Sequence, residues 1–229
     1  MPEAGLPRHP EVSALSRAVE IASLVAAPLA ALWLLQRLWP GMGPWTLPAV
    51  LAGIVAADFA SGLVHWAADT WGRQDSPLVG ERLIRPFRVH HANPRDLCAR
   101  PFVDCNGDVA SLTLPLLAWA AISDIEGAAA QRTAEFALAF CIAILPVNQV
   151  HKWAHLGSAA PCIVQLAQRA GLILSPRRHA VHHRAPFATD YCIVNGWCNP
   201  LLARAGFFRA LERVVRRATG AAPRADERA

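Results

Sequence analysis

Four long apolar runs, separated by polar segments, dominate the pattern of this sequence. They cover about residues 21–35, 47–68, 109–122 and 134–150. A helix needs about 20 residues to cross a bilayer, and the second run meets this length on its own. The other runs approach it when their apolar flanks are counted. The pattern therefore predicts an all-α integral membrane protein with about four transmembrane helices.

The second run carries polar residues at helical spacing. Asp58, Gly62, His65 and Asp69 follow one another at intervals of three or four residues. Residues so spaced share one face of a helix, and ionisable groups in a membrane helix are expected to face the bundle interior. Asp58 has two open interpretations at this point, a hydrogen bond between helices and a functional role.

The segments outside the runs predict simpler elements. Residues 1–17 are expected to form a mobile polar tail, and residues 40–44 a tight turn. Residues 71–108 form a polar loop rich in arginine and proline. An apolar segment with interspersed polar residues, 162–174, predicts a helix lying on the membrane surface. The basic helix expected over residues 207–217 is interpreted as a solvated or headgroup-facing tail.

Composition and charge agree with a membrane protein and suggest its orientation. The chain is 54% hydrophobic and 17% charged, against about 25% charged in soluble domains. The net charge of +5 comes from arginine, with no nucleic-acid motif beside it, so nucleic-acid binding is not expected. Arginines concentrate in residues 72–107 and after residue 157, whereas loops 40–46 and 124–132 contain only Arg132. The positive-inside rule then places both termini in the cytoplasm.

The remaining composition excludes several other protein classes. The six cysteines contain no Cys-x-x-Cys pair and no framework spacing, so they are expected to be reduced thiols. A cleavage site of small residues does not follow the first apolar run, which argues against a removable signal peptide. One domain is the natural count at 229 residues.

Histidines supply the candidate chemistry. Eight of the nine fall into groups that the topology above places on the cytoplasmic side, and only His9 stands alone. Neutral imidazole is a common metal ligand, and a structural zinc site needs only four ligands, so eight suggest two metal ions. The expected architecture is thus a bundle with a cytoplasmic histidine-rich di-metal cap, whose ligands include His65, His90, His91, His151, His155, His179, His182 and His183.

Two pairs of side chains stand one helical turn apart. These are His65 with Asp69 and His151 with His155. Residues at i and i+4 lie about 5–6 Å apart between Cβ atoms on one face of a helix. Each pair is therefore expected to serve one metal ion.

The other two groups contain adjacent histidines. His90 and His91 cannot share a helix face, so they are expected to reach two different ions or to bridge them. In the last group, His179 and His183 are one turn apart and His182 lies beside them. We expect these three rings to converge on one point that a metal fills.

The neighbourhood of the histidines favours a redox metal. Imidazole suits zinc, copper, nickel and iron alike. Hydrolytic zinc sites usually have a nearby general base, but the only glutamate close to a group is Glu81, and the chain has no His-Glu-x-x-His. Attack on an unreactive C–H bond of a lipid would need a redox metal.

Four ordered motifs resemble one family, the lipid desaturases that include the plasmanylethanolamine desaturases and the plant plastid desaturases acting on phosphatidylglycerol. The resemblance covers about residues 47–202. Its motifs are His65-Trp66-Ala67-Ala68-Asp69-Thr70-Trp71-Gly72, Arg85-Pro86-Phe87-Arg88-Val89-His90-His91, His151-Lys152-Trp153-Ala154-His155, and Arg178-His179-Ala180-Val181-His182-His183 followed by Tyr191-Cys192-Ile193 and Gly196-Trp197.

This resemblance implies an oxygen-dependent di-iron enzyme that introduces a double bond into a membrane lipid chain. Residues 18–205 would form the desaturase domain and residues 206–229 a basic tail. The eight histidines and Asp69 would be catalytic metal-site residues, although Asp69 stands where the general desaturase pattern has histidine, so ligand and outer partner remain alternatives. The chain has no Gly-x-Gly-x-x-Gly or cysteine-rich cluster, so a separate cytochrome b5-like or ferredoxin-like protein would supply electrons.

Several alternatives stay open from sequence. Residues 183–187 and 191–194 are closer to the plastid type, and 151–153 to the plasmanyl type, so the substrate is a plasmanyl ether lipid or a phospholipid acyl chain. A di-iron hydroxylase and a non-enzymatic haem or metal-binding membrane protein are the rival functions. Tryptophans 66, 71 and 153 are expected either to anchor at the interface or to line a chain tunnel. Arginines 85 and 88 either hold a lipid phosphate or only contribute to the positive-inside bias.

Overall fold

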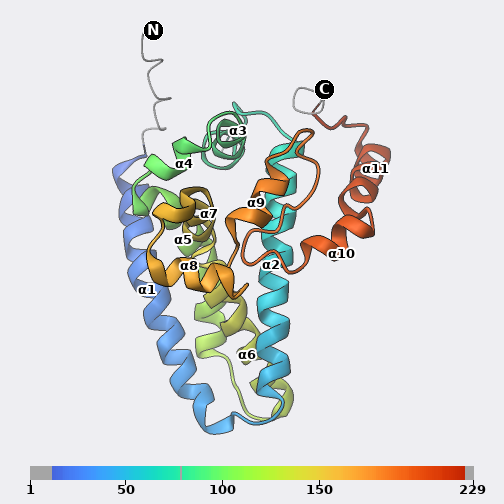
Figure 1. Cartoon of the computed structure of the whole chain (residues 1–229). Coiled ribbons are helices and arrows are strands. Elements are labelled where there is room, and N and C mark those ends of the chain that lie inside the picture. The colour runs from blue at the N-terminus through green and yellow to red at the C-terminus, as the bar shows by residue number, and fades with distance from the viewer. Residues whose placement is uncertain (1–11, 78, 225–229) are drawn as a thin grey trace.

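The computed structural model describes residues 12–77 and 79–224, and every regular element in them is a helix (Figure 1). Four helical segments are long and apolar enough to cross a membrane, which confirms the four spans expected from sequence. They contain α1 (Ala14–Leu38), α2 (Thr46–Thr70), α5 (Phe102–Ile122), and α6 (Ala128–Ile144) continued by α7 (Val147–Leu156).

The long helices pack in two main pairs, α1 on α5 and α2 on α6. Small residues allow the second pair to approach closely. A Cβ atom built on Gly53 of α2 would lie 2.5 Å from the Phe136 carbonyl oxygen of α6. Only glycine fits there without a shift of backbone. Leu34, Leu117 and Leu138 contribute to the core that joins α1, α5 and α6.

Two helices begin earlier than the hydropathy pattern predicts. The tail expected over residues 1–17 gives way to α1 at Ala14, where Ser13 caps the helix by accepting a hydrogen bond from the Ser16 amide. Residues 1–11 of that tail lie outside the described residues. The third span starts at Phe102 and not near Val109, because its first two turns are polar.

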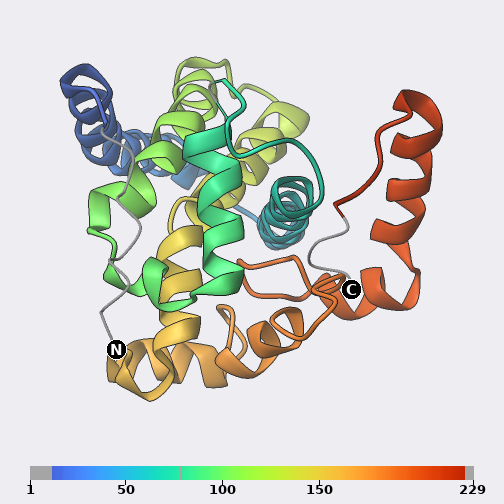
Figure 2. The same ribbon diagram turned by 90° about the horizontal axis from the view of Figure 1, so that it is seen from above.

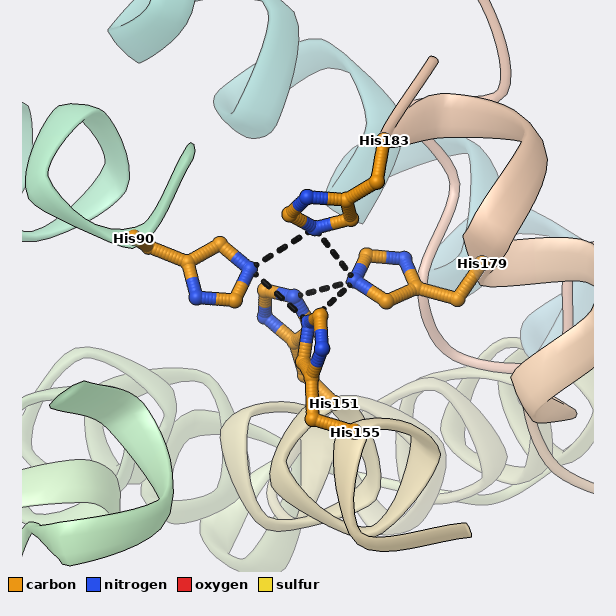
Figure 3. A group of neighbouring side chains, drawn as sticks. All are labelled: His90, His151, His155, His179 and His183. Carbon is orange, nitrogen blue, oxygen red and sulfur yellow. Dashed lines mark hydrogen bonds between the residues drawn. The ribbon is translucent and has the colours of Figure 1, made fainter. Parts of the chain in front are cut away.

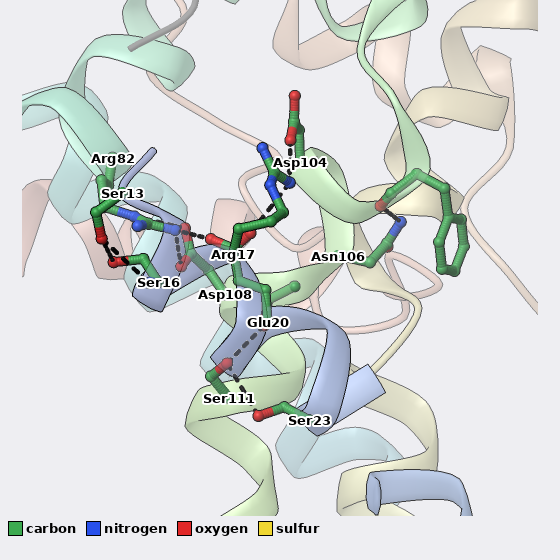
Figure 4. A network of polar contacts seen from close by, with 12 residues as sticks. Ser13, Ser16, Arg17, Glu20, Ser23, Arg82, Asp104, Asn106, Asp108 and Ser111 are labelled. Carbon is green, nitrogen blue, oxygen red and sulfur yellow. Dashed lines mark hydrogen bonds and ion pairs between the residues drawn. The ribbon is translucent and has the colours of Figure 1, made fainter. Parts of the chain in front are cut away.

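Ion pairs explain how those polar turns remain helical against α1 (Figure 4). Arg82 contacts both Glu20 of α1 and Asp108 of α5, and Arg17 of α1 contacts Glu20 and Asp104. Glu20 is buried, so its charge needs these cationic partners. The network fastens α1 and α5 to η2 (Gly80–Ile84), a short π-helix.

The fourth span is broken, which its continuous apolar run did not predict. It ends as α6 at Ile144 and resumes as α7 at Val147. Pro146 lies in the break, and its ring has no N–H to donate to the preceding turn and clashes with the carbonyl four residues earlier. The break sets the direction of α7, which carries His151 and His155.

Short helices form a cap at one end of the bundle (Figures 1 and 2). The loop expected over residues 71–108 is largely helical there, which corrects that expectation. It contains η2, α3 (Arg85–Ala92), α4 (Arg95–Ala99) and the start of α5. The other short helices are η3 (Gly157–Ala159), α8 (Cys162–Arg169), α9 (Pro176–His182), α10 (Asn199–Arg204) and α11 (Phe207–Thr219), whereas η1 (Trp39–Gly41) lies at the opposite end.

Two helices near the C-terminus differ from expectation. The helix predicted over residues 162–174 ends at Arg169, and Gly171 with φ +70° follows it. The basic helix α11 is not merely a solvated tail, because Phe208 is buried against Trp66 and Tyr191. Trp66 is accordingly a core residue of the cap, 6% exposed, and not an exposed interfacial anchor.

Asp58 and Arg88, each of which had two possible roles from sequence, form hydrogen bonds to the backbone. Asp58 accepts hydrogen bonds from the amides of Asn195, Gly196 and Cys198, so it anchors a loop and does not join two helices. Arg88 is buried and donates to the carbonyls of Trp71 and Gly72, which holds α3 against the end of α2. Its guanidinium serves the fold at this position.

Candidate metal centre

Four helical segments bring the nine candidate residues together inside the cap. Their ligand atoms form two groups, in each of which all atoms lie within 4.8 Å of one another. We call these the five-histidine group and the histidine–aspartate group. The first contains His90, His151, His155, His179 and His183, and the second contains His65, Asp69, His91 and His182.

Local sequence explains the position of the candidate ligands of α9. Ser175 caps α9 by accepting a hydrogen bond from the Arg178 amide, and Pro176 occupies the first turn, where its missing N–H costs nothing. The helix then places His179 and His182 at its end, and His183 is the residue that terminates it.

Helical spacing accounts for the division into two groups. His65 with Asp69, and His151 with His155, stay together because residues at i and i+4 share a face. His90 at the end of α3 joins the five-histidine group, whereas its neighbour His91 joins the other. Adjacent helical residues point about 100° apart, which directs the two rings to different groups.

The expectation that His179, His182 and His183 meet at one point was wrong. His179 and His183 belong to the five-histidine group, and His182 belongs to the histidine–aspartate group. Helical geometry separates His182 from His183 by about 100° around the end of α9, and the position of α9 in the cap determines which group each ring joins. The three histidines of the α9 segment and the two of α3 are therefore each divided between the two groups.

The five-histidine group is a set of Nε2 atoms that face one another (Figure 3). The Nε2 of His179 lies 2.8 Å from that of His151, 2.6 Å from that of His155 and 3.0 Å from that of His183. The Nε2 of His90 lies 2.9 Å from that of His155 and 3.0 Å from that of His183.

Hydrogen bonds alone cannot satisfy this arrangement. A neutral imidazole nitrogen offers either one N–H or one lone pair, yet His179 Nε2 contacts three other nitrogens. A shared cation accounts for the distances directly. Two nitrogens at right angles, each about 2.1 Å from one ion, would be about 3.0 Å apart. The five nitrogens thus fit neighbouring positions around a single metal ion.

The histidine–aspartate group surrounds a buried carboxylate. Asp69 Oδ2 lies 3.3 Å from His65 Nε2, 3.3 Å from His91 Nε2 and 3.5 Å from His182 Nε2. These separations exceed the usual N–H···O length of about 2.7–3.2 Å. Three nitrogens and one carboxylate oxygen around a common centre also fit a divalent metal ion.

Backbone carbonyls orient two of these rings. His65 Nδ1 donates to the Tyr191 carbonyl at 3.0 Å, and His182 Nδ1 donates to the Thr189 carbonyl at 2.8 Å. A carbonyl only accepts, so the proton stays on Nδ1 and leaves the Nε2 lone pair free for a metal. Sequence analysis missed this role of residues 189–191, although Tyr191 was part of the motif noted there.

Burial lowers the pKa of four histidines of the cap helices α3 and α9. It lowers the pKa of His90 and His179 well below the usual value of about 6.5, and neighbouring imidazoles add to the effect. Burial also lowers the pKa of His182 to about 4, although the Asp69 carboxylate opposes it, and lowers the pKa of His183 to about 3. Neutral rings at pH 7 have the lone pairs that metal binding requires.

Comparison with known proteins identifies the family. The family model of the lipid desaturase domain matches residues 54–226 of this chain. The chain belongs to the lipid desaturase family. It is therefore an integral membrane oxidoreductase, and the non-enzymatic haem or metal-binding alternative no longer applies.

Named relatives support the same conclusion. The plasmanylethanolamine desaturase of Myxococcus xanthus is 41% identical over 214 residues, covering 92% of this chain and 76% of the relative. Mouse plasmanylethanolamine desaturase 1 is 41% identical over 210 residues, covering 90% and 77%. The chloroplastic fatty acid desaturase 4 of Arabidopsis thaliana is 36% identical over 177 residues, covering 76% and 52%. No solved structure matches this chain.

Proposed function

We propose that this desaturase acts on a plasmanyl lipid and converts its ether-linked alkyl chain into a vinyl ether. The observation that carries this choice is the 41% identity, over 92% and 90% of the chain, to two proteins named plasmanylethanolamine desaturase. The chloroplastic fatty acid desaturase is less similar and matches less of the chain, 36% over 76%. A phospholipid acyl chain is thus the second choice of substrate.

We further propose that two iron ions occupy the two groups. Desaturation removes two hydrogen atoms from the chain, that is two protons and two electrons, and zinc has no redox chemistry to accept the electrons. The balanced reaction takes the alkyl ether, dioxygen, two electrons and two protons to the vinyl ether and two waters. Bound iron would supply the activation of dioxygen. The electrons would come from a separate donor protein.

The protein's own residues would hold the ions and keep water out. His65, His179 and His182 are at most 2% exposed, so the donor atoms of these three rings are shielded from bulk solvent. Tyr191 is also buried, and its ring packs beside those of His65 and His182 while its carbonyl fixes the His65 tautomer. Orientation of the ligands before the ions bind reduces the entropy lost on binding.

The purified enzyme tests this proposal directly. With about two irons per chain, an electron donor and a plasmanyl lipid, we expect a product lighter by two hydrogens, detected by mass spectrometry. A product that gains one oxygen would identify a hydroxylase. Desaturation of acyl chains with the ether chain unchanged would show that the substrate is a phospholipid acyl chain. Stoichiometric zinc in the purified protein, with no activity after iron is added, would refute the assignment of iron.

We also propose that the cap and both termini face the cytoplasm. The support is the arginine content of the cap segments compared with the loops at the opposite end, where Arg132 is the only one. An epitope tag after residue 229 should be cleaved by protease added to the cytoplasmic side. The matched control is a tag inserted at Glu126, between α5 and α6, which should be protected. Protection of the C-terminal tag together with cleavage of the tag at Glu126 would show the opposite orientation in the membrane.

A further inference from the structure

An apolar cavity of about 370 Å³, partly open along its side, lies against α2 and α6 and is also lined by Leu35 of α1. Its end toward the cap is formed by Val150, Ile173 and Val194. Its opposite end is formed by Met42 and Glu135. Ligand pockets for small molecules measure about 300–1,000 Å³ and are mostly apolar, so the space suits a hydrocarbon.

The cap end of the cavity lies close to the candidate metal centre. Val150 directly precedes His151 on α7 and packs with Ile193 and Val194 in one apolar cluster. From there the cavity extends away from the cap. Its lining reaches Val50 on α2, which lies about 22 Å along the helix axis from His65 at 1.5 Å per residue.

A polar layer closes the far end. Glu135 is 1% exposed and accepts hydrogen bonds from Thr46 at 3.0 Å and from Gln131 at 3.1 Å. Arg132 forms an ion pair with the same carboxylate oxygen at 3.0 Å. Moving a methyl-terminated chain into this layer would separate buried polar partners, which is costly. The layer therefore limits how far a hydrocarbon can extend.

We propose that this cavity receives the distal part of the chain being desaturated, and that its depth sets the chain length the enzyme accepts. This inference rests on the proposed function. In a vinyl ether the new double bond is next to the ether oxygen, so the reacting carbons are at the start of the chain. The rest of the chain must extend away from the metal centre, and the cavity is an apolar space in that direction.

Ala143 offers the sharpest test, because it lines the cavity and is only half-buried. The Ala143→Phe side chain should block the middle of the cavity. With two plasmanyl lipids that differ only in ether-chain length, we expect activity on the longer one to fall at least about tenfold relative to the shorter. Iron content should not change. The matched control is Ala52→Phe on the exposed face of α2, outside the lining, which should alter neither ratio nor iron.

A second variant guards against misfolding of the first. Met42→Ala removes side-chain volume at the far end of the cavity, where the residue is half-buried, and should extend the length of ether chain that the enzyme accepts. Equal loss on both lipids by Ala143→Phe with iron retained would overturn the inference. The inference would also be overturned if the effect of Ala143→Phe on activity depended on the length of the lipid's acyl chain and not on that of its ether chain. If acyl chains alone are desaturated, the proposed substrate fails, and the same length series on the acyl chain tests the cavity separately.

Discussion

The His179→Ala variant is expected to lose desaturase activity entirely and to bind one metal ion fewer. His179 Nε2 contacts three of the other four nitrogens in the five-histidine group, so no other ligand there has as many neighbours. Its removal leaves that group without its central contact. The histidine–aspartate group does not contain His179 and should keep its ion. Iron content should therefore fall from about two per chain to about one.

Two comparison variants make this result specific. His182→Ala removes a ligand from the histidine–aspartate group only, and should also reduce iron to about one per chain. His9→Ala changes the one histidine outside the four sequence groups and should leave iron and activity intact. In His179→Ala and His182→Ala, activity should fall by more than the loss of about 10 to 100-fold that is typical when a residue supporting a metal ligand is removed. A His179→Ala enzyme with full iron would show that the five nitrogens do not share an ion.

Much of this centre could be predicted because helical geometry is local. The spacing of His65 with Asp69 and of His151 with His155 places each pair in one group, and the structure does so. The separation of His90 from His91 follows from the same rule. These relations depend only on the turn of one helix, and not on how helices pack.

Other features depended on contacts between distant segments. The assignment of His182 requires the orientation of α9 relative to α2, which no spacing within α9 reveals. The break at Pro146 was hidden because the residues around it are all apolar, although proline is a known interruption. Burial of Phe208 against Trp66 joins residues far apart in sequence, so the basic helix α11 was mistaken for a tail.

The α2 helix connects these observations. Its Asp58 and Ser61 accept hydrogen bonds from the amides of residues 193, 195, 196 and 198, and so fasten that loop to the helix. A Cβ built on Gly62 would lie 2.4 Å from Cys192 Sγ, so glycine is needed for the contact. The same segment presents the Tyr191 carbonyl that orients His65. One helix thus carries two candidate ligands and the support for one of them.

Asp69 gives the most discriminating prediction. Because its Oδ2 lies within 3.5 Å of three Nε2 atoms and is buried, we expect it to be a direct ligand. Asp69→Asn keeps the shape and removes the negative charge, so one ion per chain should be lost together with all activity. If the carboxylate only supported another ligand, iron would remain and activity would fall by about 10 to 100-fold.

Two further variants complete this test. Asp69→His replaces the oxygen donor by a neutral nitrogen that also binds iron, so it should regain part of the lost metal. Asp75→Asn removes an exposed carboxylate whose partner is Arg73, and serves as the control for loss of charge alone. Asp69→Ala with full activity and full iron would assign the second ion to three histidines without any carboxylate. The iron content of Asp69→Asn distinguishes the two roles even if both variants are inactive, because only the loss of a ligand empties the histidine–aspartate group while the five-histidine group stays filled.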